Sequence, residues 1–362
     1  MLEQKQTSTM WPHRLVRYTL FGIIIMVLSI IPWAFGSYGT WLGSNVLILA
    51  LFAVSFNLLL GYSGLLSFGQ AGFFAVGAYV CAKVLIAVPW LILGLASGVL
   101  AAALLSLVLG CLCVRHTRIY FSMLTLAFGM MIHSVIWKWR AVTGGDDGLV
   151  NVPRPPLSLG LFQLELNNDV TYYYFLLLCT AIGVYLLWRL VNSPLGLALQ
   201  GLRDSEQRVA FSGLSVYRYR LVAFTIAGSV AGFAGTLMVM LTKYAYPDMA
   251  HWTFSAEPIM ATLMGGVSTF AGPIVGVLIL YFAKEIIVRF TEYWLLLLGS
   301  TVVVLVLGFR GGVVMALQQS LPFLATPAGE GGTGTVSEGE TNPTTGGTRP
   351  DAEPPPADRS SL

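Results

Sequence analysis

Charged residues are scarce in this sequence. Asp, Glu, Lys and Arg make up only 10% of its 362 residues, and hydrophobic residues make up 56%, whereas a soluble domain carries about 25% charged residues. A soluble globular protein is therefore excluded for most of the chain. Cysteine is also scarce, and all its positions lie in apolar segments. We expect buried apolar side chains there rather than a disulfide or metal set. The positions are Cys81, Cys111, Cys113 and Cys179.

A nucleotide-binding motif is missing as well. The chain contains no GxxxxGK[ST] sequence, the motif whose backbone amides and lysine hold nucleotide phosphates. The glycine-rich stretch GGVSTFAGP at 265–273 lacks the terminal Lys-Ser/Thr pair. We therefore expect no ATP hydrolysis by this chain, no cofactor or metal bound to it and no nucleic acid partner. The first apolar run is long and lacks a small-residue cleavage site, so we expect no cleavable signal.

Long apolar runs dominate the rest of the sequence. A helix needs about 20 residues to cross the hydrocarbon layer, and lipid offers no hydrogen-bond partners to other open backbone. The runs show no period-two alternation, so the sequence predicts an all-α, polytopic membrane bundle with about ten segments. Residues 255–266 are short for a full crossing, which favours a re-entrant or half helix ended by Gly265-Gly266. The segments lie at 19–35, 42–60, 68–87, 89–114, 119–136, 172–188, 221–242, 255–266, 272–289 and 293–309.

Positive charge sets the predicted orientation, because Lys and Arg in short loops stay in the cytoplasm. Such residues precede the first segment, follow the fourth, and cluster between the sixth and seventh. These three places share one side if every segment crosses. We therefore expect a cytoplasmic N-terminal segment (1–18) and a transmembrane permease domain (19–317) with a cytoplasmic loop at 189–220 and an exported loop at 137–171. Residues 318–362 are poor in large apolar residues, and we expect a disordered tail. The tail is cytoplasmic if all ten segments cross, and on the opposite side if 255–266 does not.

The polar stretch SPLGLALQGLRDSEQRVAFSG, residues 193–213, lies between two long apolar segments. Ser193 is a good N-cap and Pro194 suits the first helical position, so a short helix is predicted. Its apolar residues fall at helical spacing on one face; they are Leu195, Leu199 and Leu202. A loop used only for orientation would need neither feature, so we expect a rigid knob that can transmit force.

A second short helix is predicted directly after the first. Asp204 can cap it, with Gln207 three residues later as in a capping box. Asp204 and Arg208 have the spacing of a weak ion pair, and Gly213 is suited to end the helix.

This stretch resembles the coupling loop of LivM-type permease subunits in bacterial ABC importers of the branched-chain amino acid class. The resemblance is carried by Ser193, Pro194, Gly196, Ala198, Leu199, Arg203, Asp204, Glu206, Gly213 and Tyr219-Arg220. Leu197 and Gln200 stand where the family commonly has basic residues. Other stretches over roughly 15–317 are similar to that family too, namely SFNLLLGYSGLLSFGQAGFFAVGAYV (55–80), IYFSMLTLAFG (119–129), TGGDDGL (143–149) and GGVSTFAGP (265–273).

The resemblance implies a transporter subunit of the bacterial inner membrane that makes no covalent bonds itself. Alternating access would be driven by partner ABC ATPase subunits that hold ATP-Mg. The other implied partners are a second permease subunit, which would form a heterodimer with this chain, an extracytoplasmic substrate-binding protein and membrane lipid. Branched-chain amino acids are the implied cargo, with urea or short amides as the alternative. The implied ATPase-coupling residues are Ser193, Pro194, Gly196, Ala198, Arg203, Asp204, Glu206, Arg208 and Gly213.

Glycines and small polar residues interrupt the apolar sequence between Ser55 and Gly77. Broken backbone at membrane depth is tolerated where protein buries it or a cavity hydrates it, which favours a substrate passage. Close helix packing explains small residues equally well, so both interpretations stay open. The candidate passage residues are Asn57, Gly61, Ser63, Gly64, Ser67, Gln70, Gly265 and Gly266.

Two other classes of protein compete with a permease. Residues 61–64 spell GxSG, which resembles the nucleophile motif of rhomboid-like intramembrane serine proteases, with His133 as a conceivable base. A secondary transporter or channel should instead show coupled intramembrane acids or a repeated half, and neither is found in the sequence. The test between classes is whether transport depends on an ATPase.

Overall fold

The computed structural model describes residues 12–116, 118–158, 163–308 and 312–315. All of them belong to one compact unit, which ends at Phe323. Residues 1–11 of the expected N-terminal segment and the whole of the expected tail (318–362) lie outside the described residues. Within these residues the fold is helical, apart from one antiparallel pair of two-residue strands, β1 (Leu157–Ser158) and β2 (Gln163–Leu164). The prediction of an all-α class is confirmed in this form.

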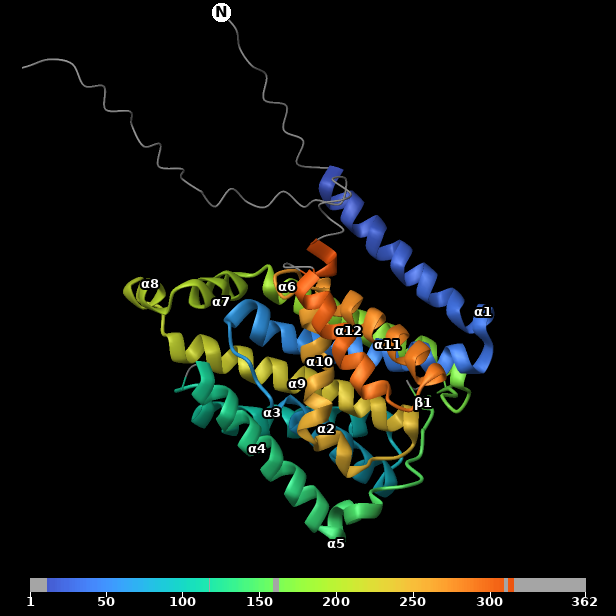
Figure 1. The fold of residues 1–362 in the computed structure, drawn as a ribbon. Coiled ribbons are helices and arrows are strands. Elements are labelled where there is room, and N and C mark those ends of the chain that lie inside the picture. The colour runs from blue at the N-terminus through green and yellow to red at the C-terminus, as the bar shows by residue number, and fades with distance from the viewer. Residues whose placement is uncertain (1–11, 117, 159–162, 309–311, 316–362) are drawn as a thin grey trace, which may run out of the picture. The chain divides into compact units, whose positions relative to one another are not determined.

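The helices follow one another in the order shown in Figure 1. They are α1 (Pro12–Asn57), η1 (Leu58–Tyr62), α2 (Gln70–Ala87), α3 (Leu91–Cys113), α4 (Arg118–Lys138), α5 (Arg140–Thr143), η2 (Gly145–Asp147), α6 (Asp169–Val191), α7 (Pro194–Asp204), α8 (Glu206–Phe211), α9 (Val216–Thr242), η3 (Pro247–Ala250), α10 (Trp252–Gly265), α11 (Gly272–Phe290) and α12 (Trp294–Gly308).

Six helices of the described part are long and apolar enough to cross a membrane. Each overlaps a predicted segment, so the chain is a multi-pass membrane protein. The predicted number of about ten is not confirmed, because the six do not include the first part of α1, α10, α11 or α12. Of these, α10 and α12 have only 14 and 15 residues. The six are Gly36–Tyr62, Gln70–Ala87, Leu91–Cys113, Ile119–Lys138, Asp169–Val191 and Val216–Thr242.

A sharp break divides α1 into two parts at Gly36. This residue has φ 63° and ψ −155°, which lies outside the helical region and which a residue with a side chain rarely adopts. The label α1 therefore covers two helices that meet at Gly36, in agreement with the two segments predicted at 19–35 and 42–60.

Small residues bring the central helices α2, α3 and α9 into close contact. A Cβ atom at Gly77 would overlap the backbone of Gly232, and one at Gly228 would overlap Ser106. Direct backbone approach of this kind is the usual role of glycine between membrane helices. For Gly77 the packing interpretation is therefore the correct one. Next to this contact, the ring centroid of Phe74 lies 5.0 Å from that of Phe52 and 4.9 Å from that of Phe254, which joins α1, α2 and α10.

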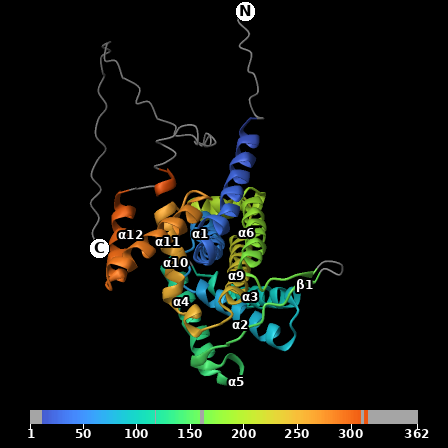
Figure 2. The same cartoon turned by 90° about the vertical axis from the view of Figure 1, so that its right-hand side faces the viewer.

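Figure 1 shows α7 and α8 at one end of the helical bundle, with α5 and β1 at the opposite end. The C-terminal helices α10, α11 and α12 lie together on one side of the bundle in Figure 2. The insert and the 137–171 loop are thus separated by the length of the membrane helices.

Candidate functional site

The first helix of the insert, α7, begins as predicted. Ser193 is its N-cap residue and Pro194 its first residue. The Ser193 hydroxyl, however, donates to the carbonyl of Leu190 at 2.6 Å and does not accept from α7. Leu199 and Leu202 are buried and Leu195 packs against the same core, so the predicted apolar face holds the helix against the bundle.

The second helix, α8, begins one residue later than predicted. Asp204 is the last residue of α7, and Ser205 is the N-cap, whose hydroxyl accepts from the backbone N–H of Arg208 at 3.4 Å. Serine and aspartate are comparable N-caps, and the extended backbone falls at Ser205 (φ −161°, ψ 108°). The capping box from Asp204 to Gln207 and the ion pair with Arg208 are therefore wrong. Asp204 lies 3.6 Å from Arg203 instead.

The end of α8 agrees with the sequence. Gly213 follows the last turn with φ 83°, the left-handed conformation that ends many helices.

Gly196, at the start of α7, has a different reason for lacking a side chain, because a Cβ atom there would overlap the carbonyl of Val191. The tight turn between α6 and α7 depends on this glycine.

Arg203 connects the insert to the membrane bundle. Its Nη1 donates to the carbonyl oxygen of Gly61 at 2.5 Å, and its Cγ lies 3.0 Å from where a Cβ of Gly64 would be. The sequence analysis grouped Arg203 with residues facing the ATPase. In the structure, its guanidinium points back into the bundle.

A second polar link joins α8 to α9. Glu206 accepts a hydrogen bond from Nη2 of Arg220. The side chain of Arg220 is only 5% exposed, and that of Glu206 is 43% exposed. Sequence reasoning treated Arg220 as one of several orienting charges and missed this role, because a contact across 14 positions leaves no helical spacing to find.

The segment that Arg203 contacts is a break in the first membrane helix. After Asn57 the chain forms a single π-helical turn, η1, and it becomes helical again only at Gln70. Turns of this kind are rare and concentrate at functional sites. The carbonyl of Gly61 therefore lies at an irregular part of the backbone, where it is free to accept from Arg203.

The same break meets the glycine-rich segment after α10. Asn57 is fully buried, its Nδ2 donates to the carbonyl of Thr269 at 3.2 Å, and its Oδ1 has no partner among the described residues. A Cβ at Gly61 would come within 2.5 Å of the Val267 carbonyl. Two candidate passage segments, 57–64 and 265–269, are thus in direct contact.

The half helix α10 ends as predicted. Its last residue is Gly265, and Gly266 has φ 118°. A Cβ at Gly265 would overlap the carbonyl of Gly272 at the start of α11. Both glycines are therefore required by geometry, one by its backbone conformation and one by close approach.

Of the remaining candidate passage residues, Ser63, Ser67 and Gln70 are buried, whereas Gly64 is exposed. Ser63 donates to the Leu59 carbonyl at 2.7 Å, which is a bond within its own turn. Ser67 and Gln70 are fully buried, and their side-chain polar atoms lack partners within the described part of the chain. At the start of α2, the N–H of Ala71 donates to the hydroxyl of Ser255 at 2.9 Å. The sequence analysis missed Ser255, a contact that 184 positions of chain separate from its partner.

Comparison with known proteins decides the family. Residues 38–307 match the family described as "Branched-chain amino acid transport system / permease component". The chain belongs to this family. Its relatives include the high-affinity branched-chain amino acid transport system permease protein LivM of Escherichia coli, 29% identical over 81% of this chain and 74% of the relative, and LivM of Salmonella typhimurium, 28% identical with the same coverage. The L-arabinose ABC transporter permease protein AraH of Azospirillum brasilense is 27% identical over 58% of this chain and 60% of the relative. No solved structure matches the chain.

The permease is not a serine protease. The Ser63 hydroxyl is used by the Leu59 carbonyl, and the ring of His133 packs against His251 and Trp137 at 5.2 and 5.8 Å. A nucleophilic serine needs its base within hydrogen-bond reach, and Ser63 and His133 make no hydrogen bond with each other in the described part of the chain. The GxSG tetrapeptide of the permease is therefore a chance match.

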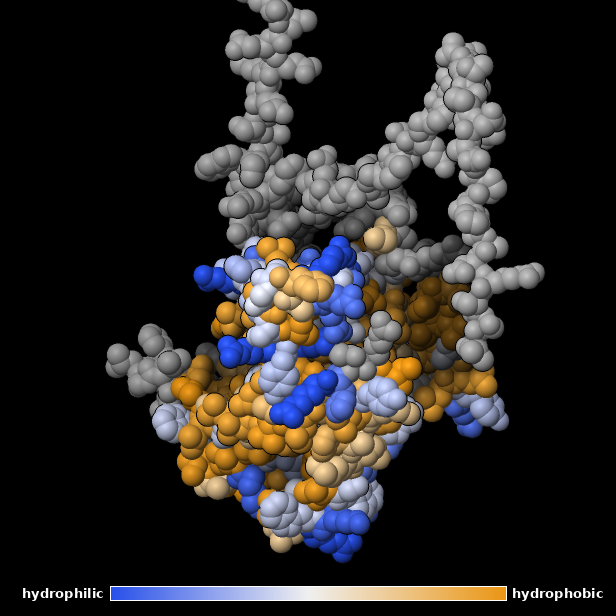
Figure 3. Space-filling view, turned by 90° about the vertical axis from the view of Figure 1, so that its left-hand side faces the viewer, coloured by the Kyte–Doolittle hydropathy of each residue, from blue (hydrophilic) through white to orange (hydrophobic). Residues whose placement is uncertain are grey.

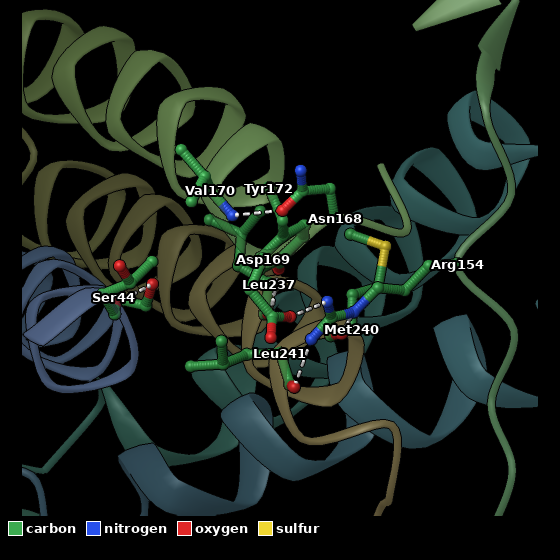
Figure 4. A network of polar contacts seen from close by, with 10 residues as sticks. Ser44, Arg154, Asn168, Asp169, Val170, Tyr172, Leu237, Met240 and Leu241 are labelled. Carbon is green, nitrogen blue, oxygen red and sulfur yellow. Dashed lines mark hydrogen bonds and ion pairs between the residues drawn. The ribbon is translucent and has the colours of Figure 1, made fainter. Parts of the chain in front are cut away.

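At the other end of the permease, Arg154 joins the loop 137–171 to the helices α6 and α9 (Figure 4). Its Nε donates to the Met240 carbonyl, its Nη2 to the Leu241 carbonyl at 2.5 Å, and its Nη1 to Oδ1 of Asp169 at 2.8 Å. Its guanidinium carbon also lies 4.5 Å from the ring centre of Tyr172. A cation at the last carbonyls of α9 is favoured by the helix dipole. The sequence analysis counted Arg154 and Asp169 only as loop charges.

Proposed function

We propose that this chain is the membrane-spanning permease subunit of an ATP-dependent importer of branched-chain amino acids in the bacterial inner membrane. Its family supports this function, and so do the names of the two LivM relatives. Because the chain has no nucleotide-binding motif, ATP-Mg would be held by separate ATPase subunits. An extracytoplasmic binding protein would deliver the cargo, and a second permease subunit would complete the passage as a heterodimer.

The observation that carries the mechanism is the contact between Arg203 and Gly61. In our proposal the ATPase pushes on α7 and α8, whose coupling residues include Ser193, Pro194, Ala198 and Arg208. Displacement of α7 would pull on the Gly61 carbonyl. Because that carbonyl belongs to an irregular π-helical turn, the break is the part of the helix that is easiest to rearrange. The passage that holds the bound cargo would then open to one side of the membrane or to the other.

A docking surface for the ATPase supports this proposal. Leu197 on α7 is 68% exposed and Phe211 at the end of α8 is 90% exposed. Both lie on the insert, where Figure 3 shows hydrophilic residues gathered beyond a broad hydrophobic surface. Large apolar side chains that project from a polar surface are typical centres of protein interfaces. Gly196, Gly213 and Glu206 would keep these two side chains in place, and the exposed carboxylate of Asp204 would face the ATPase.

We also propose that the first part of α1, α10, α11 and α12 all cross the membrane and bring the number of segments to about ten, although the 14 residues of α10 are short for a full crossing. The loop 189–220 and the tail 318–362 would then be cytoplasmic and the loop 137–171 exported. A cysteine placed at Ser337, in a variant without the four native cysteines, tests this orientation. Labelling of intact cells by an impermeant maleimide would overturn it, and labelling only after permeabilisation would support it.

The function is tested by reconstitution of the whole importer in liposomes. Leucine uptake should require internal Mg-ATP, the ATPase subunits and the binding protein. Uptake by the permease alone would overturn the proposal. Uptake of urea, a short amide or arabinose in place of leucine would keep the permease function and overturn the cargo.

A further inference from the structure

An open recess lies on the exported side of the bundle, between the start of the second part of α1, the start of α6 and the end of α9. Its volume is about 240 Å³, somewhat below the usual range of about 300–1,000 Å³ for small-molecule sites, so it suits a ligand of a few heavy atoms. Charged residues line it from three segments of the chain, namely Arg154, Asp169 and Lys243. None of the residues proposed for the passage or for ATPase coupling takes part.

One of the two cations of the recess, Lys243, has no hydrogen-bond or ion-pair partner among the described residues. Arg154 donates to two carbonyls and to Asp169 and is 3% exposed, so its role is structural. Lys243 is exposed, and its ammonium group makes no hydrogen bond or ion pair with any described residue. Its backbone is fixed, since it adopts φ 56° at the end of α9 and its carbonyl accepts from the N–H of Val152 at 3.1 Å. The lysine is therefore presented to the recess from a rigid position.

Only one of the two carboxylate oxygens of Asp169 has a partner among the described residues. Asp169 uses Oδ1 for Arg154, whereas its Oδ2 has no partner in the described ranges, and its side chain is 69% exposed. Ser44 on α1 lines the same recess and is labelled in Figure 4. The hydroxyls of Ser44 and Thr40 each donate to a carbonyl one turn earlier, both at 2.8 Å. Their oxygens therefore retain the capacity to accept a hydrogen bond.

The rest of the lining is apolar. Trp41 is 48% exposed, and Leu241 is 8% exposed and contributes a buried wall. Burial of a ligand's aliphatic side chain against this surface would lower the free energy by about 25 cal/mol per Å² of apolar surface removed from water. The recess thus combines a free ammonium, a free carboxylate oxygen, hydroxyl acceptors and an apolar surface.

We propose that this recess is an entry site for a free zwitterionic amino acid. The carboxylate of the ligand binds the ammonium of Lys243, and its ammonium binds Oδ2 of Asp169 and the oxygens of Ser44 and Thr40. Its side chain lies on Trp41 and Leu241. The inference rests on the proposed function, since it names a site that amino acids occupy on their way to the passage.

Other ligand charges fit less well. A carboxylic acid without an ammonium group would face the free oxygen of Asp169, and an amine without a carboxylate would face Lys243 beside Arg154. A neutral amide would leave both charges of the recess without a partner. Each mismatch costs a charged hydrogen bond, worth about 1.5–3 kcal/mol, so a zwitterion should bind at least about tenfold more tightly than either half.

The test is equilibrium binding of radiolabelled leucine to the complete importer in lipid nanodiscs, without the binding protein. We expect saturable binding, competed by unlabelled leucine but about tenfold less well by leucinamide or 4-methylpentanoate. Lys243→Gln and Asp169→Asn should each weaken binding about tenfold. Lys83→Gln and Asp248→Asn are matched controls, since both change exposed charges that do not line the recess, and they should bind like the unaltered importer.

The outcomes separate this inference from the proposed function. Asp169→Asn also removes the partner of Arg154 and can therefore cause a folding defect. Lys243→Gln breaks no hydrogen bond or ion pair of the described residues, so its binding of leucine decides the test in that case. Absence of saturable binding, equal competition by leucinamide, or normal binding by Lys243→Gln would overturn the entry site while ATP-dependent leucine uptake stands. If Lys243→Gln weakens association of the binding protein but not of leucine, the recess is a docking point and the inference is wrong. If the unaltered importer takes up no leucine at all, the proposed function fails instead.

Discussion

The guanidinium of Arg203 donates a hydrogen bond to the carbonyl oxygen of Gly61, a residue 142 positions earlier in the chain. The donor lies on a short helix outside the membrane helices, and the acceptor lies in the π-helical break of the first one. A hydrogen bond from a charged group is worth about 1.5–3 kcal/mol when it is protected from solvent. Since Arg203 is 40% exposed, we place this one at the lower end. The bond is strong enough to transmit a displacement and weak enough to be exchanged within a transport cycle.

Loss of this bond should uncouple ATP hydrolysis from transport. In Arg203→Gln, the shorter neutral side chain no longer reaches the Gly61 carbonyl with a charged donor, so leucine uptake should fall about tenfold. ATP hydrolysis stimulated by the binding protein should continue, and the ratio of ATP hydrolysed to leucine imported is the measurement.

Arg218→Gln is the matched control for this prediction. Arg218 is exposed at the start of α9 and its side chain makes no described contact with the broken segment. Its ratio of ATP to leucine should equal that of the unaltered importer. An unchanged ratio in Arg203→Gln would mean that the Gly61 contact carries no force.

The link between Glu206 and Arg220 should contribute to stability. Removing the carboxylate in Glu206→Ala leaves the Arg220 guanidinium, 5% exposed, without its charged partner. Because Glu206 is itself 43% exposed, solvent screens the pair, and the loss should be about 1 kcal/mol rather than the larger cost of a fully buried pair. The thermal midpoint of the purified permease should therefore fall by a few degrees, as about 1 kcal/mol gives in a domain of this size.

Asp204→Ala serves as the comparison, since it removes a carboxylate 63% exposed and 3.6 Å from its partner. Its thermal midpoint should be unchanged. If both variants melt alike, α8 is not held to α9 by this pair.

Local sequence patterns predicted much of the insert and little of its attachment. The positions of Ser193, Pro194 and Gly213 at the helix ends were predicted correctly because helix starts and ends depend mainly on neighbouring residues, although the Ser193 hydroxyl makes no capping bond to α7. Asp204 was placed one residue wrong because Ser205 is an equally good cap, and only the observed backbone at Ser205 distinguishes them. The partners of Arg203 and Arg220 could not be predicted, since each is set by how helices far apart in the sequence pack together. The recess near Lys243 was missed for the same reason.

Close approach at the start of α11 should make Gly265 intolerant of substitution. A Cβ in Gly265→Ala would overlap the carbonyl of Gly272, which belongs to backbone and cannot rotate away. We expect a loss of about 1–3 kcal/mol, the usual cost of overpacking, measured as a lower thermal midpoint and faster proteolysis. Gly299→Ala in α12 has nothing within 4 Å of the new atom, so its midpoint should be unchanged or slightly higher through helix propensity. Equal behaviour of the two variants would show that α10 and α11 separate easily.

The bond from Asn57 to the Thr269 carbonyl joins the two broken segments of the proposed passage. If these segments move as one gate, Asn57→Ala should lower leucine uptake about fivefold, because a neutral hydrogen bond is worth about 1 kcal/mol. ATP hydrolysis should stay near normal, since Arg203 and the insert are untouched. Asn192→Ala is the matched control, because the Asn192 amide bonds only to the Trp188 carbonyl four residues earlier, and its uptake should equal that of the unaltered importer. Full transport by Asn57→Ala would separate the two segments into independent packing elements, and the passage would then have to be sought elsewhere among the buried polar residues, at Ser67 and Gln70.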